Sequence, residues 1–416
     1  MLMPALAHKF HALAASAALA AAALVPLPAH ADPAGSCALG GMTTRQKLAQ
    51  LLMPGVTGAQ DMRDVVAREQ VGGVFIGSMT SHALLSSGQI GEISASAGAP
   101  LLVSIDEEGG RVSRIPDLIG QAPSARTLAQ TKTPEQVRAF AADRGRQLRA
   151  LGVTADFAPD ADVFAGDADT VIGDRSFSGD PHTAAEYAEA YAQGLRDGGV
   201  LPVVKHFPGH GRASGDSHQG SVTTPDLADL QDFDLVPFRE IVGRLGSGTA
   251  VMVGHLTVPG LTEPGLPTSL SPATYRLLRE GSGYGAAGFD GLVFTDDLSG
   301  MKAVSSRYDV PHAVAAALEA GADVALWLST SQVSAVLDTL EHEVASGAFP
   351  IARVEASVGR VLAAKGVRAG TCGVGQARPA APEEPGHDPE LTDEPTEDED
   401  APAADEAPAE DARPVE

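Results

Sequence analysis

The side chains best suited to chemistry gather in one short segment of the chain. Within fourteen positions it holds a lysine, three histidines and an aspartate, namely Lys205, His206, His210, Asp216 and His218. The apolar residues 201–204 come directly before it, and glycine and proline interrupt it. A buried strand that ends in such a loop usually delivers its side chains to a pocket. The segment therefore predicts a functional site at the end of a strand.

Asp216 and His218 have a spacing that suits proton transfer. In a turn, the carboxylate can accept a hydrogen bond from one ring nitrogen and leave the other nitrogen facing a substrate. Such a bond orients the imidazole and raises its basicity, as a general acid/base requires. We therefore assign the acid/base role to this pair.

A second apolar run, residues 291–295, ends at two adjacent carboxylates. We place Asp296 in the pocket, where it could serve as a nucleophile, a base or a metal ligand. We expect Asp297 to cap the following helix or to hold the site from behind.

Three other kinds of site use similar residues. A metal centre could employ Asp216 and the nearby histidines, but the chain lacks H-x-H after a first strand and H-E-x-x-H on a helix. Lys205 could form a Schiff base, although its neighbours do not supply an apolar pocket. A non-catalytic binding protein would not need an Asp-oriented histidine. We therefore predict an enzyme without a metal or organic cofactor.

Alternating strands and helices are expected to position these residues. The strand candidates are Leu51–Val56, Val71–Ile76, Leu101–Ile105, Thr154–Ala158, Leu201–Val204, Ala250–Val253, Gly291–Thr295 and Asp323–Leu328. The helix candidates are Pro134–Leu151, Ala184–Asp197, Ala228–Arg244, Pro272–Glu280, Ala313–Ala320 and Val333–Ser346. This order predicts an α/β fold, a TIM-like (β/α)8 barrel in one catalytic domain. A doubly wound open sheet is the alternative, but the glycine-rich phosphate fingerprint of that fold is missing.

Polar residues follow the third to seventh predicted strands. They are Asp106 to Arg111, Asp160 with Asp162, Lys205 with His206, His255, and Asp296 with Asp297. In a barrel the ends of all strands open onto one rim, where barrel enzymes carry out their chemistry. Their common position after strands predicts a single active site.

The N-terminal residues 1–31 have the features of a secretory signal. A short polar start precedes an Ala/Leu-rich run and the small residues Ala29-His30-Ala31, which predicts cleavage after Ala31. Prolines break the apolar run, so we expect no membrane span. We predict a secreted or cell-envelope protein. Lipid attachment at Cys37 is the alternative, but no leucine lies three places before it.

The C-terminal residues 375–416 are rich in Pro, Ala, Asp and Glu, and we predict a disordered tail. Residues 376–416 hold 15 acidic and two basic residues, about half of the formal net charge of −25. The remaining chain is mildly acidic, which argues against a nucleic-acid partner. Cys37 and Cys372 bracket the predicted domain, residues 32–374. In an exported protein this arrangement suggests a disulfide.

Several longer motifs resemble the single-domain β-N-acetylglucosaminidases of glycoside hydrolase family 3, across residues 42–370. The motifs are Asp106 to Val112 with Arg114, Phe157-Ala158-Pro159, Asp162-Val163, Ile172 to Phe177, Lys205 to Gly211, Asp216-Ser217-His218, Asp234 to Phe238, and Thr295 to Leu298. Two positions depart from the family pattern. Glu107 stands where Gln or His is more common, and Gly300 separates Ser299 from Met301.

The resemblance implies a retaining mechanism. Asp296 would attack the anomeric carbon to form a covalent glycosyl-enzyme, and His218, oriented by Asp216, would serve as acid and then as base. The residues that the resemblance assigns to sugar binding are Asp106, Arg114, Arg175, Lys205 and His206.

The resemblance also implies a small carbohydrate substrate. We expect exo-action on terminal β-linked GlcNAc of peptidoglycan fragments, with chitin oligosaccharides as the rival. The single tryptophan, Trp327, and an aromatic content of 4% favour a short pocket. Another family 3 β-glycosidase and a phosphorolytic variant remain alternatives, because a histidine acid/base would not repel phosphate. We expect a monomer.

Overall fold

The computed structural model describes residues 41–367. The predicted signal peptide, both cysteines of the predicted disulfide and the acidic tail lie outside this range.

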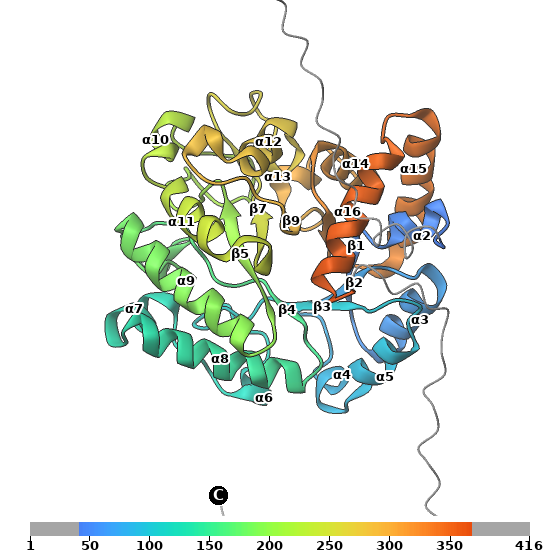
Figure 1. Ribbon diagram of the computed structural model, residues 1–416, viewed down its shortest axis with the longest axis horizontal. Coiled ribbons are helices and arrows are strands. Elements are labelled where there is room, and N and C mark those ends of the chain that lie inside the picture. The colour runs from blue at the N-terminus through green and yellow to red at the C-terminus, as the bar shows by residue number, and fades with distance from the viewer. Residues whose placement is uncertain (1–40, 368–416) are drawn as a thin grey trace, which may run out of the picture. The chain divides into compact units, whose positions relative to one another are not determined.

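Eight parallel strands close into a barrel in the order β1-β10-β9-β7-β5-β4-β3-β2 (Figure 1). The strands are β1 (Leu52–Val56), β2 (Gly73–Ile76), β3 (Leu102–Ile105), β4 (Ala155–Asp156), β5 (Leu201–Phe207), β7 (Ala250–Val253), β9 (Val293–Asp297) and β10 (Val324–Trp327). Each strand begins within one of the eight predicted segments, and β5 and β9 extend a few residues past the predicted ends. The predicted TIM-like barrel is confirmed, and the open sheet is wrong because β1 pairs with both β2 and β10. Two short strands, β6 (Val222–Thr223) and β8 (Leu256–Thr257), pair separately.

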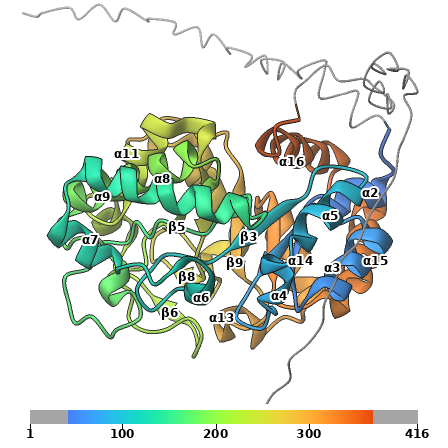
Figure 2. The same cartoon turned by 90° about the horizontal axis from the view of Figure 1, so that it is seen from below.

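Helices surround the barrel, and α8 and α9 pack side by side along one flank (Figure 2). The helices are α2 (Thr44–Ala49), α3 (Ala59–Glu69), α4 (Ala83–Ser86), α5 (Gln89–Ser96), α6 (Pro116–Ile119), α7 (Ala125–Thr131), α8 (Pro134–Ala150), α9 (Pro181–Asp197), α10 (Leu227–Gln231), α11 (Leu235–Leu245), α12 (Pro272–Glu280), α13 (Lys302–Ser305), α14 (Val310–Ala320), α15 (Val333–Ser346) and α16 (Ile351–Ala364). No helix in the described part of the chain is long and apolar enough to cross a membrane.

Local sequence explains how the two longest of these helices begin. Thr133 and Gln136 form a reciprocal capping box before α8, and Asp180 accepts a hydrogen bond from the Thr183 N–H at the start of α9. Both helices also carry a proline in their first turn, where a backbone N–H would have no partner within the helix.

The predicted helix Ala228–Arg244 is wrong as a single element, because the structure divides it into α10 and α11. Pro237 explains the break. Proline cannot donate a helical hydrogen bond and clashes with the preceding turn, so it is accommodated in the first turn of a helix. In the structure Pro237 is the third residue of α11.

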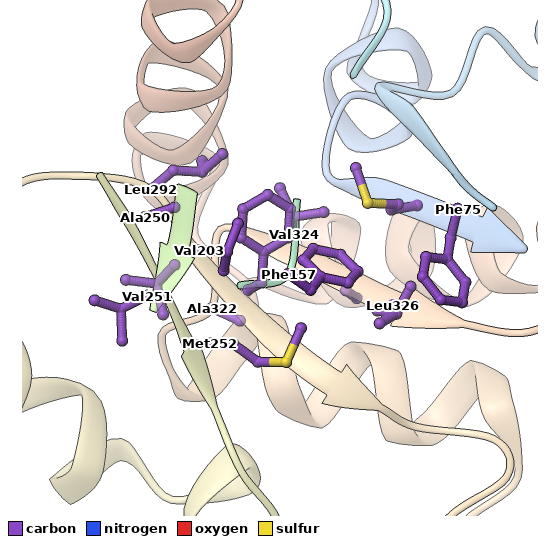
Figure 3. Packing of buried hydrophobic residues seen from close by; sticks show 14 of the residues in the cluster. Phe75, Phe157, Val203, Ala250, Val251, Met252, Leu292, Ala322, Val324 and Leu326 are labelled. Atoms are coloured by element: carbon purple, nitrogen blue, oxygen red, sulfur yellow. The ribbon is translucent and has the colours of Figure 1, made fainter. Parts of the chain in front are cut away.

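Phe75 and Phe157 lie among aliphatic side chains in the buried core (Figure 3). The Phe75 and Phe157 rings stack with their centroids 5.5 Å apart, and Phe294 meets Phe157 edge-on at 5.4 Å. Trp327 is fully buried in β10. Phe75 and Phe157 also line the cavity at the rim, so the apolar core forms its floor.

Candidate active site

A cavity of about 410 Å³ opens at the C-terminal end of the barrel strands. The predicted site residues that line it are Asp106, Arg114, Arg175, Lys205, His206, His218 and Asp296. Asp216 lies behind His218 and holds it by a hydrogen bond. The tertiary structure therefore brings all eight predicted residues to one place.

Lys205 lies among carboxylates at the C-terminal half of β5. Its ammonium pairs with Asp106 and lies 2.5 Å from Oε1 of Glu108. Burial would lower the pKa of Lys205, but these two carboxylates hold it above its usual value. The ammonium stays charged, which suits donation to sugar hydroxyls and disfavours the Schiff-base alternative. Arg114 completes the group with Nη2 at 2.8 Å from Oδ2 of Asp106.

Arg175 is fixed by Glu108, which the sequence analysis placed on the catalytic rim without assigning it a role. The Arg175 Nε and Nη2 each donate to a Glu108 oxygen at 2.8 Å. Burial would raise the pKa of Glu108, but the charges of Arg175 and Lys205 lower it well below its usual value. Glu108 thus orients both cations. Its place two residues after Asp106 was the available sequence signal.

His206 is held neutral at the base of the cavity. Its Nδ1 lies 2.7 Å from Oδ2 of Asp162, and its Nε2 lies 3.3 Å from Nη2 of Arg175. Burial, assisted by the charge of Arg175, lowers the pKa of His206 to about 4. A neutral imidazole can hydrogen-bond a sugar hydroxyl without adding charge.

The metal alternative finds different residues in the structure. Within residues 41–367, the one cluster with suitable donor spacing is Asp160, Asp162 and His206, without Asp216 or His218. Nη2 of Arg175 lies 3.4 Å from Oδ2 of Asp160 in the same cluster. A guanidinium already supplies positive charge to these donors, which disfavours a cation beside it.

Asp296 is placed by the end of β9 and remains ionised. Its Oδ1 accepts a hydrogen bond from the Asp297 N–H at 2.8 Å. Burial would raise the pKa of Asp296, but His255, this N–H and the Lys205 ammonium lower it below its usual value. An unprotonated carboxylate at the cavity is the form that a nucleophile requires.

Asp297 organises the turn that follows the candidate nucleophile. It accepts hydrogen bonds from the Ser299 N–H and Oγ at 2.8 and 2.7 Å and from the Gly300 N–H at 2.8 Å. A Cβ at position 300 would lie 2.5 Å from Oδ2 of Asp297, so a side chain here would displace that carboxylate oxygen. Asp297 was expected to cap the following helix or to hold the site from behind. It does bind backbone N–H groups, but these belong to the turn, because α13 begins only at Lys302.

The Asp216–His218 pair lies on the loop between β5 and β6. Nδ1 of His218 lies 2.8 Å from Oδ1 of Asp216, and the His218 side chain is 65% exposed. The Ser217 carbonyl accepts a hydrogen bond from the Ala303 N–H of α13 at 3.1 Å. The loop therefore docks onto the helix that follows Asp296, which brings His218 toward Asp296.

Glu107 has a structural role. It is 1% exposed, and it accepts hydrogen bonds from Nη2 of Arg144 at 2.9 Å, from Oγ of Ser113 at 2.5 Å and from the Arg114 N–H at 2.7 Å. It thereby supports the segment that carries Arg114.

We predict that Glu107→Ala lowers the free energy of unfolding by about 3–5 kcal/mol, because the change leaves the buried Arg144 charge without its carboxylate. Urea denaturation should measure this loss. Glu92→Ala, which removes a largely exposed carboxylate, should change the stability by less than about 0.5 kcal/mol. Equal stabilities for the two variants would contradict the role given to Glu107.

Comparison with known proteins agrees with this geometry. Residues 43–364 match the family model described as "Glycosyl hydrolase family 3 N terminal domain". The chain belongs to glycoside hydrolase family 3. The family 3 enzyme is 57% identical over 352 residues to the "Beta-hexosaminidase LpqI" of Mycobacterium tuberculosis, a match that covers 84% of this chain and 89% of that relative.

Solved structures resemble this glycoside hydrolase over most of its length. A family 3 glycosyl hydrolase of Mycobacterium smegmatis is 59% identical with a TM-score of 0.77, and the match covers 78% of this chain and 98% of that one. A family 3 β-N-acetylglucosaminidase from a Paenibacillus strain is 35% identical with a TM-score of 0.71, and the match covers 81% and 65% of the two chains.

Proposed function

We propose that this family 3 enzyme is an exo-acting, retaining β-N-acetylglucosaminidase. The observation that carries the proposal is the cavity that Asp296 and His218 both line, with the imidazole of His218 held by Asp216. The names of the relatives, a β-hexosaminidase and a β-N-acetylglucosaminidase, support the choice of sugar. The cavity of about 410 Å³ suits one terminal sugar and favours exo-action.

In the proposed first step, a carboxylate oxygen of Asp296 bonds to the anomeric carbon as the bond from that carbon to the leaving oxygen breaks. The protonated His218 gives its proton to the leaving oxygen. In the second step, the neutral His218 takes a proton from water, whose oxygen bonds to the anomeric carbon and releases Asp296. Asp216 holds the imidazole through Nδ1 and stabilises its cationic form.

The remaining polar residues hold the terminal sugar during both steps. Asp106 can accept from hydroxyl groups, while Lys205, Arg175 and Arg114 can donate to their oxygens. Glu108 holds Arg175 and Lys205 from behind. Because these groups bond one another before substrate arrives, little reorganisation is needed on binding.

We also propose the natural substrate and its location. A secretory signal in residues 1–31 would place the enzyme in the cell envelope or outside the cell, where peptidoglycan fragments carry terminal β-linked GlcNAc. Chitin oligosaccharides are the alternative substrate class.

The test is product analysis with the mature chain from Asp32. Proton NMR of a reaction with N,N′-diacetylchitobiose, and of one with a GlcNAc–muramyl peptide, should show β-GlcNAc first and α-GlcNAc only as mutarotation proceeds. EDTA should not change the rate. Initial release of α-GlcNAc, or turnover of β-glucosides but not of β-N-acetylglucosaminides, would contradict the proposal. Formation of GlcNAc 1-phosphate in phosphate buffer would indicate the phosphorolytic alternative.

A further inference from the structure

A cavity of about 800 Å³ lies at the end of the barrel opposite to the proposed active site. Its lining residues Asp290 and Asp323 come just before β9 and β10, whereas Asp296 lies near the other end of β9. Figure 2 shows α16, which forms one wall of this cavity, above the barrel, and α13, which follows β9, below it. The two cavities share no lining residue. A ligand in this distal cavity would therefore leave the catalytic cavity open.

Arginine side chains gather around the distal cavity. Two come from α12 and two from α16, namely Arg276, Arg279, Arg353 and Arg360. Three carboxylates line the same cavity, those of Glu280, Asp290 and Asp323. The whole chain has 54 acidic residues against 29 basic ones, so a lining with more cations than carboxylates departs from the rest of the protein. This local excess of guanidinium groups predicts an anionic ligand.

Asp323 fixes the two inner arginines. Its carboxylate is fully buried and accepts hydrogen bonds from Nη2 of Arg279 at 2.5 Å and from Nη1 of Arg360 at 3.2 Å. The Ser357 Oγ and the Val293 N–H donate to the same carboxylate at 2.8 and 2.9 Å. Burial lowers the pKa of Arg279, Asp323 opposes this effect, and the charge of Arg360 adds to the lowering. Two guanidinium groups thus repel each other across one buried carboxylate.

The two outer arginines have N–H groups to spare. Within residues 41–367, neither Arg276 nor Arg353 takes part in an ion pair, and the one side-chain hydrogen bond of Arg353 goes to the Leu318 carbonyl at 3.1 Å. Both side chains are exposed, and they approach the cavity from different helices. A guanidinium group can bind two oxygens of a phosphate at once. The pair can therefore share a doubly charged phosphate group.

The rest of the lining suits an organic group attached to the phosphate. Buried Tyr275 and Phe289 contribute aromatic surface, and Ala352 and Ala356 keep the α16 wall low. A volume of about 800 Å³ exceeds what one phosphate ion fills. Exposed Glu280 can accept hydrogen bonds from hydroxyl groups at the edge. Aromatic surface beside a few polar groups is typical of a small-molecule site.

We propose that the distal cavity binds a phosphate monoester, and that a sugar phosphate is its ligand. A phosphate monoester carries up to two negative charges and three free oxygens, which matches the two unpaired guanidinium groups better than a carboxylate with one charge. Inorganic phosphate offers the same charged group without the sugar. The proposal does not rest on the proposed function, because no catalytic residue contributes to this site.

The experiment measures binding to the mature chain from Asp32 by isothermal titration calorimetry at low ionic strength. The probes are glucose 6-phosphate, inorganic phosphate, and glucuronate, which has a carboxylate on a similar ring. The variants are Arg276→Ala, Arg353→Ala and the double change. Arg146→Ala is the matched control, because Arg146 is also an exposed helical arginine but lies on α8 outside the cavity. All of these changes remove exposed side chains, so each variant should fold as the wild type does.

We expect each single change to raise the Kd for glucose 6-phosphate by about three- to tenfold, and the double change by about ten- to a hundredfold. Arg146→Ala should bind as the wild type does, and every variant should keep its turnover. Tighter binding of glucose 6-phosphate than of inorganic phosphate would assign the site to a sugar phosphate, and equal binding would assign it to phosphate alone. Three results would each overturn the site: no binding of either phosphate up to about 10 mM, an unchanged Kd in the double variant, or equal affinity for glucuronate.

Discussion

Asp296→Ala should lower kcat/KM for 4-nitrophenyl β-N-acetylglucosaminide by roughly four to six orders of magnitude, the scale of losing a covalent nucleophile. The reason is that no other carboxylate can reach the anomeric carbon from the end of β9. Asp297 is committed to the Ser299 and Gly300 N–H groups. Release of 4-nitrophenol measures the effect.

Azide gives this prediction a second readout. In Asp296→Ala, azide can enter the space of the missing carboxylate and attack an activated β-glycoside from the α face, which yields the α-glycosyl azide. Asp143→Ala, a change of an exposed carboxylate on α8, should keep wild-type activity and yield no azide product. If Asp296→Ala retained more than about a tenth of wild-type activity, the nucleophile would have to be another residue.

His218→Ala should lower kcat/KM by about 10²- to 10⁴-fold for substrates whose leaving group needs a proton. The loss should shrink for 2,4-dinitrophenyl β-N-acetylglucosaminide, because dinitrophenolate departs without protonation. Its kcat should still fall, since breakdown of the glycosyl-enzyme needs the base. A series of aryl glycosides of decreasing leaving-group pKa measures the trend.

Azide again separates the two roles. In His218→Ala, azide should attack the intact glycosyl-enzyme from the β face and give the β-glycosyl azide, the opposite anomer to that expected from Asp296→Ala. The matched control is His312→Ala, because His312 pairs with Asp309 at 2.6 Å on the surface and lies outside the cavity that His218 and Asp296 line. A loss that is equal for all leaving groups would assign His218 to binding rather than to acid/base catalysis.

The sequence alone predicted eight alternating strands and helices and the approximate positions of the strands, while the closure of the barrel is seen in the pairing of β1 with both β2 and β10. Each strand is a short apolar run, such as residues 250–253, bounded by turns and followed by a helix-forming segment. The apolar run that indicates a buried strand and the apolar spacing that indicates a helix are both local patterns, because each depends only on residues close together in the sequence. The rule that parallel strands share one catalytic rim then placed Asp106, Lys205 and Asp296 together. The sequence did not predict the break between α10 and α11, because the helical spacing of apolar residues continues through it.

The tertiary structure decided which of several adjacent polar residues does what. Glu107 and Glu108 are neighbours in sequence, yet one is bonded to Arg144 in the body of the protein and the other to Arg175 and Lys205 in the site. Asp162 likewise became the partner of His206.

The cavity lined by segments 164–172 and 213–219 also comes only from the folded chain, because these two walls are separated by about forty residues and arginines from a third part of the chain hold the first wall by its carbonyls. Such contacts depend on where an arginine side chain points and on which backbone carbonyl it reaches. Because every residue has a carbonyl, the type and spacing of residues in the sequence do not indicate which carbonyl that is.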